Sequence, residues 1–177
     1  SGSGNDSIEL TAGNSNGGTT NMIVDSGGGN DQISLTYATA TTVHAGDGDD
    51  SVIGSTNGAD NMWGGAGDDN LFAINGDATI YGGDDDDIIV GNGELHGDAG
   101  NDVITGGQGS TFWGGAGNDN MTSTGGQALF YGGAGNDQAM GTVNANDTYY
   151  FGTGQGQDVF NGGGGGGGDT DVIMLDN

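Results

Sequence analysis

Large apolar residues recur singly along this chain, each between two polar neighbours in a three-residue segment. Glycine-rich polar turns separate one such segment from the next. Because side chains alternate between the two faces of a strand, the middle residue of each segment points inward. The pattern predicts short stacked β-strands with their apolar centres in two facing columns. One column is Ile33, Val52, Leu71, Ile89, Ile104, Met121, Ala139, Phe160 and Ile173, and the other is Val24, Val43, Met62, Ile80, Leu95, Phe112, Phe130 and Tyr150.

A nine-residue repeat underlies this pattern. Residues 65–71 read Gly-Ala-Gly-Asp-Asp-Asn-Leu, and residues 115–121 and 133–139 are close copies. Looser copies share the frame G-G-x-G-x-D-x-U-x, in which U is a large apolar residue. Most successive motif aspartates are about 18 residues apart, which is two nonapeptides, and the intervening half-repeats keep the apolar centre but mostly lack the aspartate. These motif aspartates are Asp6, Asp31, Asp50, Asp69, Asp87, Asp102, Asp119, Asp137, Asp158 and Asp171.

The repeated turn contains the residue types that a calcium site needs. Glycine permits a positive φ and close backbone approach, so that backbone oxygens of one turn can converge on an ion. The aspartate adds an anionic oxygen. Ca²⁺ takes 6–8 oxygen ligands, more than one turn supplies, so we expect each ion to lie between two stacked turns. The expected ligands are the motif aspartates and the backbone of turn glycines such as Gly65, Gly67, Gly115, Gly117, Gly133 and Gly135.

The repeat resembles the calcium-binding nonapeptide of the RTX (repeats-in-toxin) family, and the resemblance covers nearly the whole chain. It implies an all-β fold: a right-handed parallel β-roll of about ten 18-residue coils, with Ca²⁺ between stacked G-G-x-G-x-D turns. We expect a single domain over residues 1–177, with a repeat array at 1–147. Residues 148–177, which contain a poly-glycine loop, resemble the terminal module that often follows RTX arrays. In the family this region precedes a type I secretion signal, so the resemblance implies a secreted, extracellular or cell-surface protein.

Composition makes folding depend on the metal. The chain has 25 Asp and Glu residues, no Lys or Arg, and a net charge of −25, and only 31% of it is hydrophobic. Roughly two large inward side chains per coil cannot offset the ordering of the backbone at about 1–2 kcal/mol per residue. We therefore expect calcium to drive folding, with about seven ions cancelling about 14 of the negative charges.

The same composition excludes several functions. Without cationic side chains the chain cannot neutralise phosphate, which excludes most nucleic-acid binding and disfavours anionic membranes. No apolar run is long enough for membrane insertion. Cysteine is absent, so there is neither a disulfide nor a thiolate metal site. No catalytic constellation stands out from the repeat, and the prediction is that the chain is not an enzyme.

A column of rings forms a second pattern. The residue that ends each degenerate half-repeat strand points away from the core, so these rings should form a ladder on one face. We interpret the ladder either as a stiffening element or as a contact surface, for a protein partner or lateral self-association first and for carbohydrate second. Its predicted members are His44, Trp63, Tyr81, His96, Trp113, Tyr131 and Phe151.

Two functions follow as hypotheses. The first is a secreted calcium-binding structural protein whose roll folds on Ca²⁺ and stacks end to end into a homopolymeric filament or matrix. The alternative is a C-terminal calcium-binding and secretion module of a larger type I-secreted enzyme, toxin or adhesin. An ice-binding role is disfavoured because the third motif position holds no threonine row.

Overall fold

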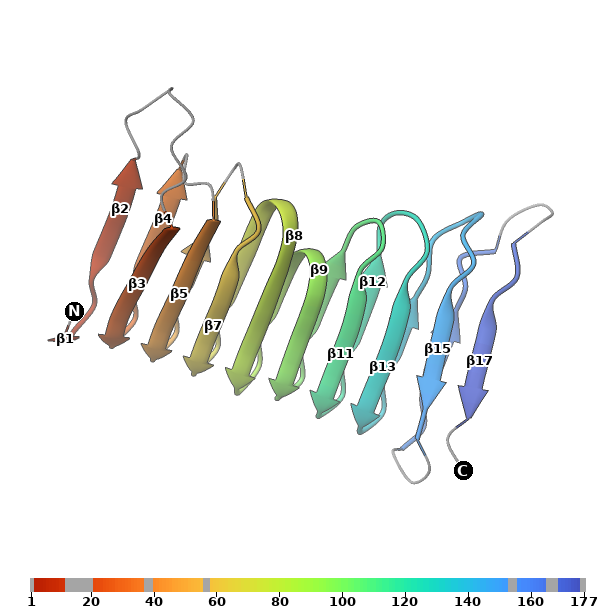
Figure 1. Cartoon of the computed structure of the whole chain (residues 1–177). Helices are drawn as coiled ribbons and strands as arrows, with labels where there is room; N and C mark the ends of the chain where they lie inside the picture. The colour runs from red at the N-terminus through yellow and green to blue at the C-terminus, as the bar shows by residue number, and fades with distance from the viewer. Residues whose placement is uncertain are drawn as a thin grey trace.

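The computed structural model describes residues 2–11, 21–36, 40–55, 58–152, 156–164 and 169–175. Across these ranges the chain is an elongated all-β solenoid, and no helix in them is long and apolar enough to cross a bilayer (Figure 1). The strands of the described part are β1 (Gly2–Ser3), β2 (Ser7–Thr11), β3 (Asn21–Gly28), β4 (Gln32–Thr36), β5 (Ala40–Asp47), β6 (Ser51–Ile53), β7 (Asn61–Ala66), β8 (Asn70–Asp84), β9 (Ile88–Ala99), β10 (Val103–Gly106), β11 (Thr111–Ala116), β12 (Asn120–Ser123), β13 (Leu129–Ala134), β14 (Gln138–Met140), β15 (Thr148–Phe151), β16 (Val159–Asn161) and β17 (Val172–Leu175).

Each strand pairs in parallel with the equivalent strand of the next coil, and the pairings form two stacks. The first stack contains β1, β3, β5, β7, the second halves of β8 and β9, and β11, β13, β15 and β17. The second stack contains β2, β4, β6, the first halves of β8 and β9, and β10, β12, β14 and β16. The predicted parallel β-solenoid is thereby confirmed. It has about seven turns with a spacing near 18 residues, fewer than the ten coils predicted.

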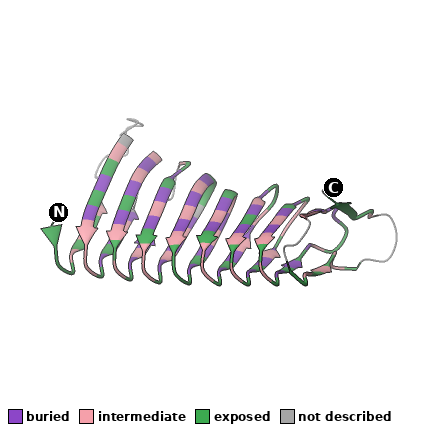
Figure 2. Cartoon of the chain, turned by 90° about the horizontal axis from the view of Figure 1, so that it is seen from below, coloured by how far each residue is buried: buried purple, intermediate pink, exposed green. Residues whose placement is uncertain are grey.

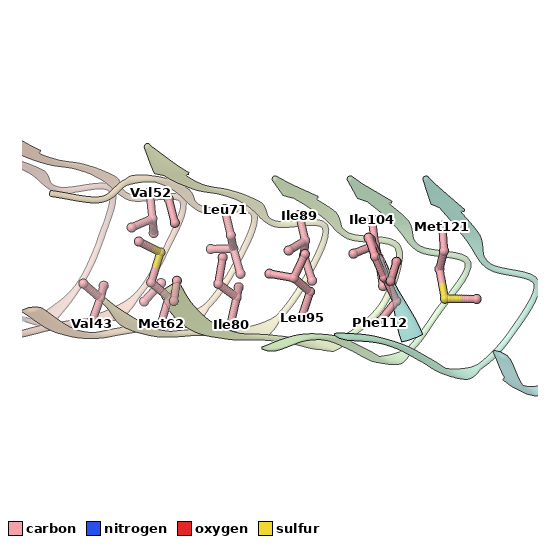
Figure 3. Close-up of a cluster of buried hydrophobic side chains, with 14 of the residues drawn as sticks. Val43, Val52, Met62, Leu71, Ile80, Ile89, Leu95, Ile104, Phe112 and Met121 are labelled. Atoms are coloured by element: carbon pink, nitrogen blue, oxygen red, sulfur yellow. The ribbon is translucent and has the colours of Figure 1, made fainter. Parts of the chain in front are cut away.

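The core is the narrow space between the two stacks. Figure 3 shows the inward residues of the two stacks facing one another, for example Leu71 above Ile80 and Ile104 above Phe112. From Val43 to Met121 the predicted inward residues are fully buried, and Figure 2 shows the resulting alternation of buried and exposed positions along the strands. This alternation follows from the two-residue period of a strand.

Two predicted core positions near the C-terminal end are wrong. Tyr149, 1% exposed, occupies the inward position that we predicted for Tyr150, because Leu129 pairs with Thr148 and this register places Tyr149 beside Phe130. Ile173 belongs to the first stack beside Tyr149, not to the second, and it is 59% exposed. The segment Tyr149–Phe151 is aromatic throughout, so its composition carries no signal of which ring points inward.

The predicted terminal module continues the same architecture. Strands β15 and β17 extend the first stack and β16 extends the second. Residues 165–168 of the poly-glycine loop lie outside the described residues.

Candidate metal centre

Aspartates of the motif line one long edge of the roll, the lower edge in Figure 1, where the arrows of the first stack end. We call it the aspartate edge. In eight successive pairs, the backbone N–H of one aspartate donates a hydrogen bond of 2.7–2.9 Å to Oδ1 of the aspartate in the next coil. Such charge-assisted bonds tie every turn to its neighbour. The residues joined in this way are Asp6, Asp31, Asp50, Asp69, Asp87, Asp102, Asp119, Asp137 and Asp158.

The second oxygen of most of these carboxylates has no partner. Seven Oδ2 atoms are buried without a hydrogen bond among the residues that the structure describes. Buried polar atoms are nearly always paired, because an unpaired one loses its hydration without compensation. A cation at this edge would supply the missing interaction. The seven are the Oδ2 atoms of Asp31, Asp50, Asp69, Asp87, Asp102, Asp119 and Asp137.

Oxygens from two adjacent turns converge beside the first glycine of the turns that contain Asp69, Asp87, Asp102 and Asp119. A Cβ placed on Gly64 would overlap Oδ2 of Asp69 and would lie about 2.5 Å from the carbonyl oxygen of Gly82 in the next turn. Gly97 has the same surroundings, formed by Asp102 and the carbonyl of Gly114. The first glycine thus leaves room at the point where carboxylate and carbonyl oxygens meet. The sequence analysis predicted ligands at the second and fourth glycines and gave the first glycine a conformational role only.

The predicted ligand glycines lie in the same turns. Gly65 and Gly67 have φ of 127° and 118°, in the left-handed region that glycine tolerates. The carbonyl oxygens of Gly65, Gly115, Gly117 and Gly135 lie against the equivalent turn glycine of the following coil. Two copies depart from the pattern, with Asp85 at the fourth position of one and Asp98 at the second position of the other. These residues adopt φ of 78° and 73°, so both turns keep their shape without glycine.

The available donors are oxygen atoms of carboxylates and backbone carbonyls, which is the donor chemistry that Ca²⁺ prefers. No group of three or more His, Asp or Glu side chains gathers into a metal cluster within the described ranges. An ion at the aspartate edge would therefore take much of its coordination from backbone carbonyls. The residues present fit Ca²⁺ on these grounds.

Comparison with known families shows to which family the repeated turns of this edge belong. The profile of the RTX calcium-binding nonapeptide repeat (4 copies) matches residues 38–71, 75–94, 91–121 and 113–142, more than half of the chain. The chain belongs to the RTX calcium-binding repeat family. A comparison with curated proteins finds no match. The fold and the turn chemistry derived above are those of an RTX β-roll, which is a structural calcium-binding fold.

Burial changes the acidity of the RTX carboxylates. Desolvation raises the pKa of Asp69 to about 7, of Asp87 to about 8, of Asp102 to about 6 and of Asp119 to about 7. The backbone N–H of the preceding aspartate opposes this rise but does not cancel it. Neighbouring carboxylates of the column add a further, smaller rise. A bound divalent cation would lower the pKa of these carboxyl groups, because it favours their ionised form.

The opposite edge of the RTX roll has a different chemistry. Asp60 is also buried, but both of its oxygens accept hydrogen bonds, Oδ1 from Thr41 and Oδ2 from the backbone N–H of Ser55 at 2.7 Å. Asp147 is similar, with Oδ1 accepting from Ala128 and Oδ2 from Thr142. These aspartates stabilise turns by hydrogen bonds alone. Position in the fold, and not residue type, separates the two kinds of aspartate.

The prediction that Asp171 belongs to the column of ligand aspartates is wrong. Its Oδ1 accepts the backbone N–H of Asp147 at 3.1 Å, which places it on the opposite edge and not on the aspartate edge. The cause is the spacing of the last two motif copies: Asp171 follows Asp158 by 13 residues (171 − 158), which is closer to a half-coil than to a full coil of about 18.

The aspartate edge also contains a second ladder of hydrogen bonds, which the sequence analysis did not predict. The side-chain oxygen at the fifth motif position accepts the backbone N–H of the equivalent residue in the following coil, as when Asn101 accepts from Asn118 at 2.9 Å. This direction is opposite to that of the buried aspartates, so each turn is held from both sides. The signal lay in the repeat, because the fifth position is Asn or Asp in most copies. The acceptors are Asn5, Asn30, Asp49, Asp68, Asp86, Asn101, Asn118 and Asn136.

The predicted ring ladder lies on the outward face of the first stack. Rings from His44 to Tyr131 stack in sequence order, with centroid distances from 3.9 to 5.7 Å. The seventh ring is Tyr150, 4.4 Å from Tyr131, and the prediction of Phe151 is wrong. Phe151 contacts Phe160 edge-on instead, because the register that buries Tyr149 turns Tyr150 outward.

Proposed function

We propose that this chain is a secreted calcium-binding structural protein, that its roll folds when calcium binds, and that rolls stack end to end into an extracellular filament or matrix. The observation that carries the calcium-dependent part is the row of buried, unpaired Oδ2 atoms on the aspartate edge. Without a cation these atoms oppose folding, and with a cation they join adjacent turns. The seven orphaned oxygens support an expectation of about seven ions.

Open strand edges support the stacking. In the described part, β2 pairs only with β4, and β17 pairs only with β15, so each presents unpaired backbone groups along one edge. The apolar side chains there are also incompletely covered, with Ile173 59% exposed although its position points toward the core column. A further coil from a second copy would pair these strands and cover these side chains.

Circular dichroism and light scattering test the proposal together. Calcium-stripped protein should be largely unfolded, and calcium should restore the β-signal with about seven ions bound by isothermal titration calorimetry. Scattering and electron microscopy of the loaded protein should show rods that lengthen with concentration in steps of about 34 Å, from about seven turns at about 4.8 Å per turn. A β-signal that survives complete calcium removal contradicts calcium-driven folding. A monomer at high concentration contradicts the filament.

A second candidate rests on the same open edges. Further coils of a longer polypeptide would cover them as well as a second copy would, which suits a calcium-binding module of a larger type I-secreted enzyme, toxin or adhesin. In either case we assign the chain no catalytic role. Mass spectrometry of the protein secreted by its native cells separates the two candidates, because only the module predicts a polypeptide much longer than 177 residues.

A further inference from the structure

The outward surface of the first stack carries few charges: Asp25 of β3 pairs in register with His44, and Glu94 and Asp98 flank His96 on β9. We call the larger part of this surface the ladder face and define it as the ring column and the row beside it on the same strands. From β5 to β15 its one carboxylate is Glu94, in a chain that has 25. Trp113 is 39% exposed and Leu129 38% exposed on it. The ladder face consists of His44, Trp63, Tyr81, His96, Trp113, Tyr131 and Tyr150, with Thr42, Asn61, Thr79, Glu94, Thr111, Leu129 and Thr148.

The rings present edges, not faces, to the outside. From Trp63 to Tyr131 every ring lies between two neighbouring rings at interplanar angles of 0–20°. A sugar stacks on the open face of an aromatic ring, and here those faces are already covered. Carbohydrate stacking is therefore disfavoured along the column. What remains is a rigid, apolar strip that loses little conformational entropy when another surface covers it.

The strip is also concave at one end. Trp113, Tyr131 and Tyr150 form a groove with Met174 and Leu175, of about 420 Å³. Met174 and Leu175 are 45% and 73% exposed at its rim. Apolar, concave and uncharged surfaces of this kind are typical of contact sites.

Size distinguishes the two outward faces of the roll. Strands β7, β11 and β13 have 6 residues each, whereas β6, β10, β12 and β14 have 3 or 4. With about 3.3 Å per residue and about 34 Å of length, the whole outward surface of the first stack, of which the ladder face is the larger part, offers about 650 Å² per copy, and that of the second stack about 400 Å². Two outward surfaces of the first stack together bury about 1,300 Å², within the range of specific interfaces, while two of the second bury about 800 Å², which is the size of a packing contact.

We propose that the ladder faces of two calcium-loaded copies pack against each other, so that rolls associate laterally. A second copy is the occupant that the charge distribution favours, because it brings a surface with few charges and of the same length and rigidity. A two-fold axis parallel to the roll axis pairs the faces and places the two aspartate edges on opposite sides of the dimer. The remaining like charges are then far apart, and salt strengthens the association by screening them. This contact differs from end-to-end stacking, although it requires the calcium-loaded fold proposed above.

One pair of substitutions isolates the interface. Leu129 and Val103 are each the first residue of a strand and are 38% and 45% exposed, on the ladder face and on the opposite face respectively. Leu129→Asp and Val103→Asp add the same charge and remove similar apolar side chains. We expect Leu129→Asp to raise the dissociation constant of the lateral dimer at least tenfold, and Val103→Asp to leave it unchanged. Thr111→Asp and Asn120→Asp, at the first residues of β11 and β12, form a second pair if the first misfolds.

Sedimentation equilibrium in calcium measures the association, and small-angle X-ray scattering shows its geometry. A lateral dimer doubles the cross-section at constant length, whereas end-to-end stacking lengthens the rod at constant cross-section. Both tryptophans of the chain lie in the ladder, so their emission should shift to shorter wavelength as the dimer forms. The proposal is overturned if the loaded protein stays one roll wide at millimolar concentration, if both substitutions act equally, or if oligosaccharides shift the emission of a monomer. Failure of calcium to induce β-structure instead contradicts the proposed function, and circular dichroism reports it separately.

Discussion

Asp69 and Asp60 are both buried carboxylates, yet their second oxygens differ. Oδ2 of Asp60 accepts a hydrogen bond from Ser55, and Oδ2 of Asp69 has none in the described part of the chain. Both residues accept a backbone hydrogen bond on Oδ1. The hydrogen-bond pattern of a single atom therefore separates an aspartate suited to a cation from one that stabilises a turn.

Replacing each aspartate by asparagine tests this difference. Asp69→Asn keeps an acceptor for Asp50 but removes the charge at the orphan oxygen, so we expect about one fewer calcium ion per chain. Asp60→Asn leaves Ser55 without its acceptor and should cost about 1–3 kcal/mol of stability, with the number of ions unchanged. Isothermal titration calorimetry counts the ions and thermal unfolding measures the stability. Equal stoichiometry in the two variants would disprove the assignment.

At the scale of an element, the unit of this protein is the turn that joins two short strands. Each motif turn is tied to the preceding coil by its buried aspartate and to the following coil by its fifth residue. Close stacking of the turns leaves no space for a side chain at Gly65, where φ is 127° and a Cβ would overlap the carbonyl of Gly46. The turn is thus specified by glycine for steric reasons as well as conformational ones.

Alanine substitutions at two glycines test whether the turn requires glycine for steric and conformational reasons or whether glycine content in general determines stability. Gly65→Ala combines a positive φ with steric overlap, and we expect it to destabilise the calcium-loaded roll by at least about 2 kcal/mol. A Cβ at Gly125 would lie 3.9 Å from its nearest neighbour, the backbone nitrogen of Gln108, so Gly125→Ala should change stability by less than about 0.5 kcal/mol. Thermal unfolding in excess calcium measures both values. A Gly125→Ala loss as large as that of Gly65→Ala would show that general backbone freedom, and not turn packing, sets the requirement.

At the scale of the whole molecule, charge and hydrophobicity are segregated. The buried aspartates and the exposed acidic turns lie along one edge, the apolar residues form the narrow core, and the ladder face is nearly uncharged. The column of carboxylates opposes the compact state until protons or cations neutralise it. Stability of the whole roll should therefore depend on pH in a definite direction.

The pKa values set that direction. Aspartate ordinarily has a pKa of 3.8, and burial raises the pKa of Asp69 to about 7 and of Asp87 to about 8. Because the folded chain binds these protons more tightly, their contribution is fully present below about pH 4 and is lost as the pH rises through 7–8. Calcium-stripped protein should gain β-signal on acidification, and half-saturation should need more calcium at pH 6 than at pH 8. A calcium-free β-signal that increases with pH would contradict this mechanism.

Much of this architecture is encoded in the order of residues along the chain. The spacing of the motif aspartates and of the single apolar residues correctly predicted the parallel solenoid, the facing core columns and the ladder from His44 to Tyr131. These features repeat in nearly every coil, and a repeated pattern specifies its own register. The nonapeptide also indicated the RTX family, and the profile match confirms that membership.

The features that the sequence did not predict correctly depend on how coils of unequal length align. Tyr149 replaced Tyr150 in the core, and Asp171 moved to the opposite edge, because only strand pairing sets the register after an irregular turn. Whether an aspartate keeps an unpaired oxygen depends on the shape of its own turn: Oδ2 of Asp60 accepts from Ser55, five residues earlier, whereas Oδ2 of Asp69 has no such donor in the described part of the chain. Local residue type and period are encoded in consecutive residues, whereas contacts between coils exist only after the chain has wound around its axis.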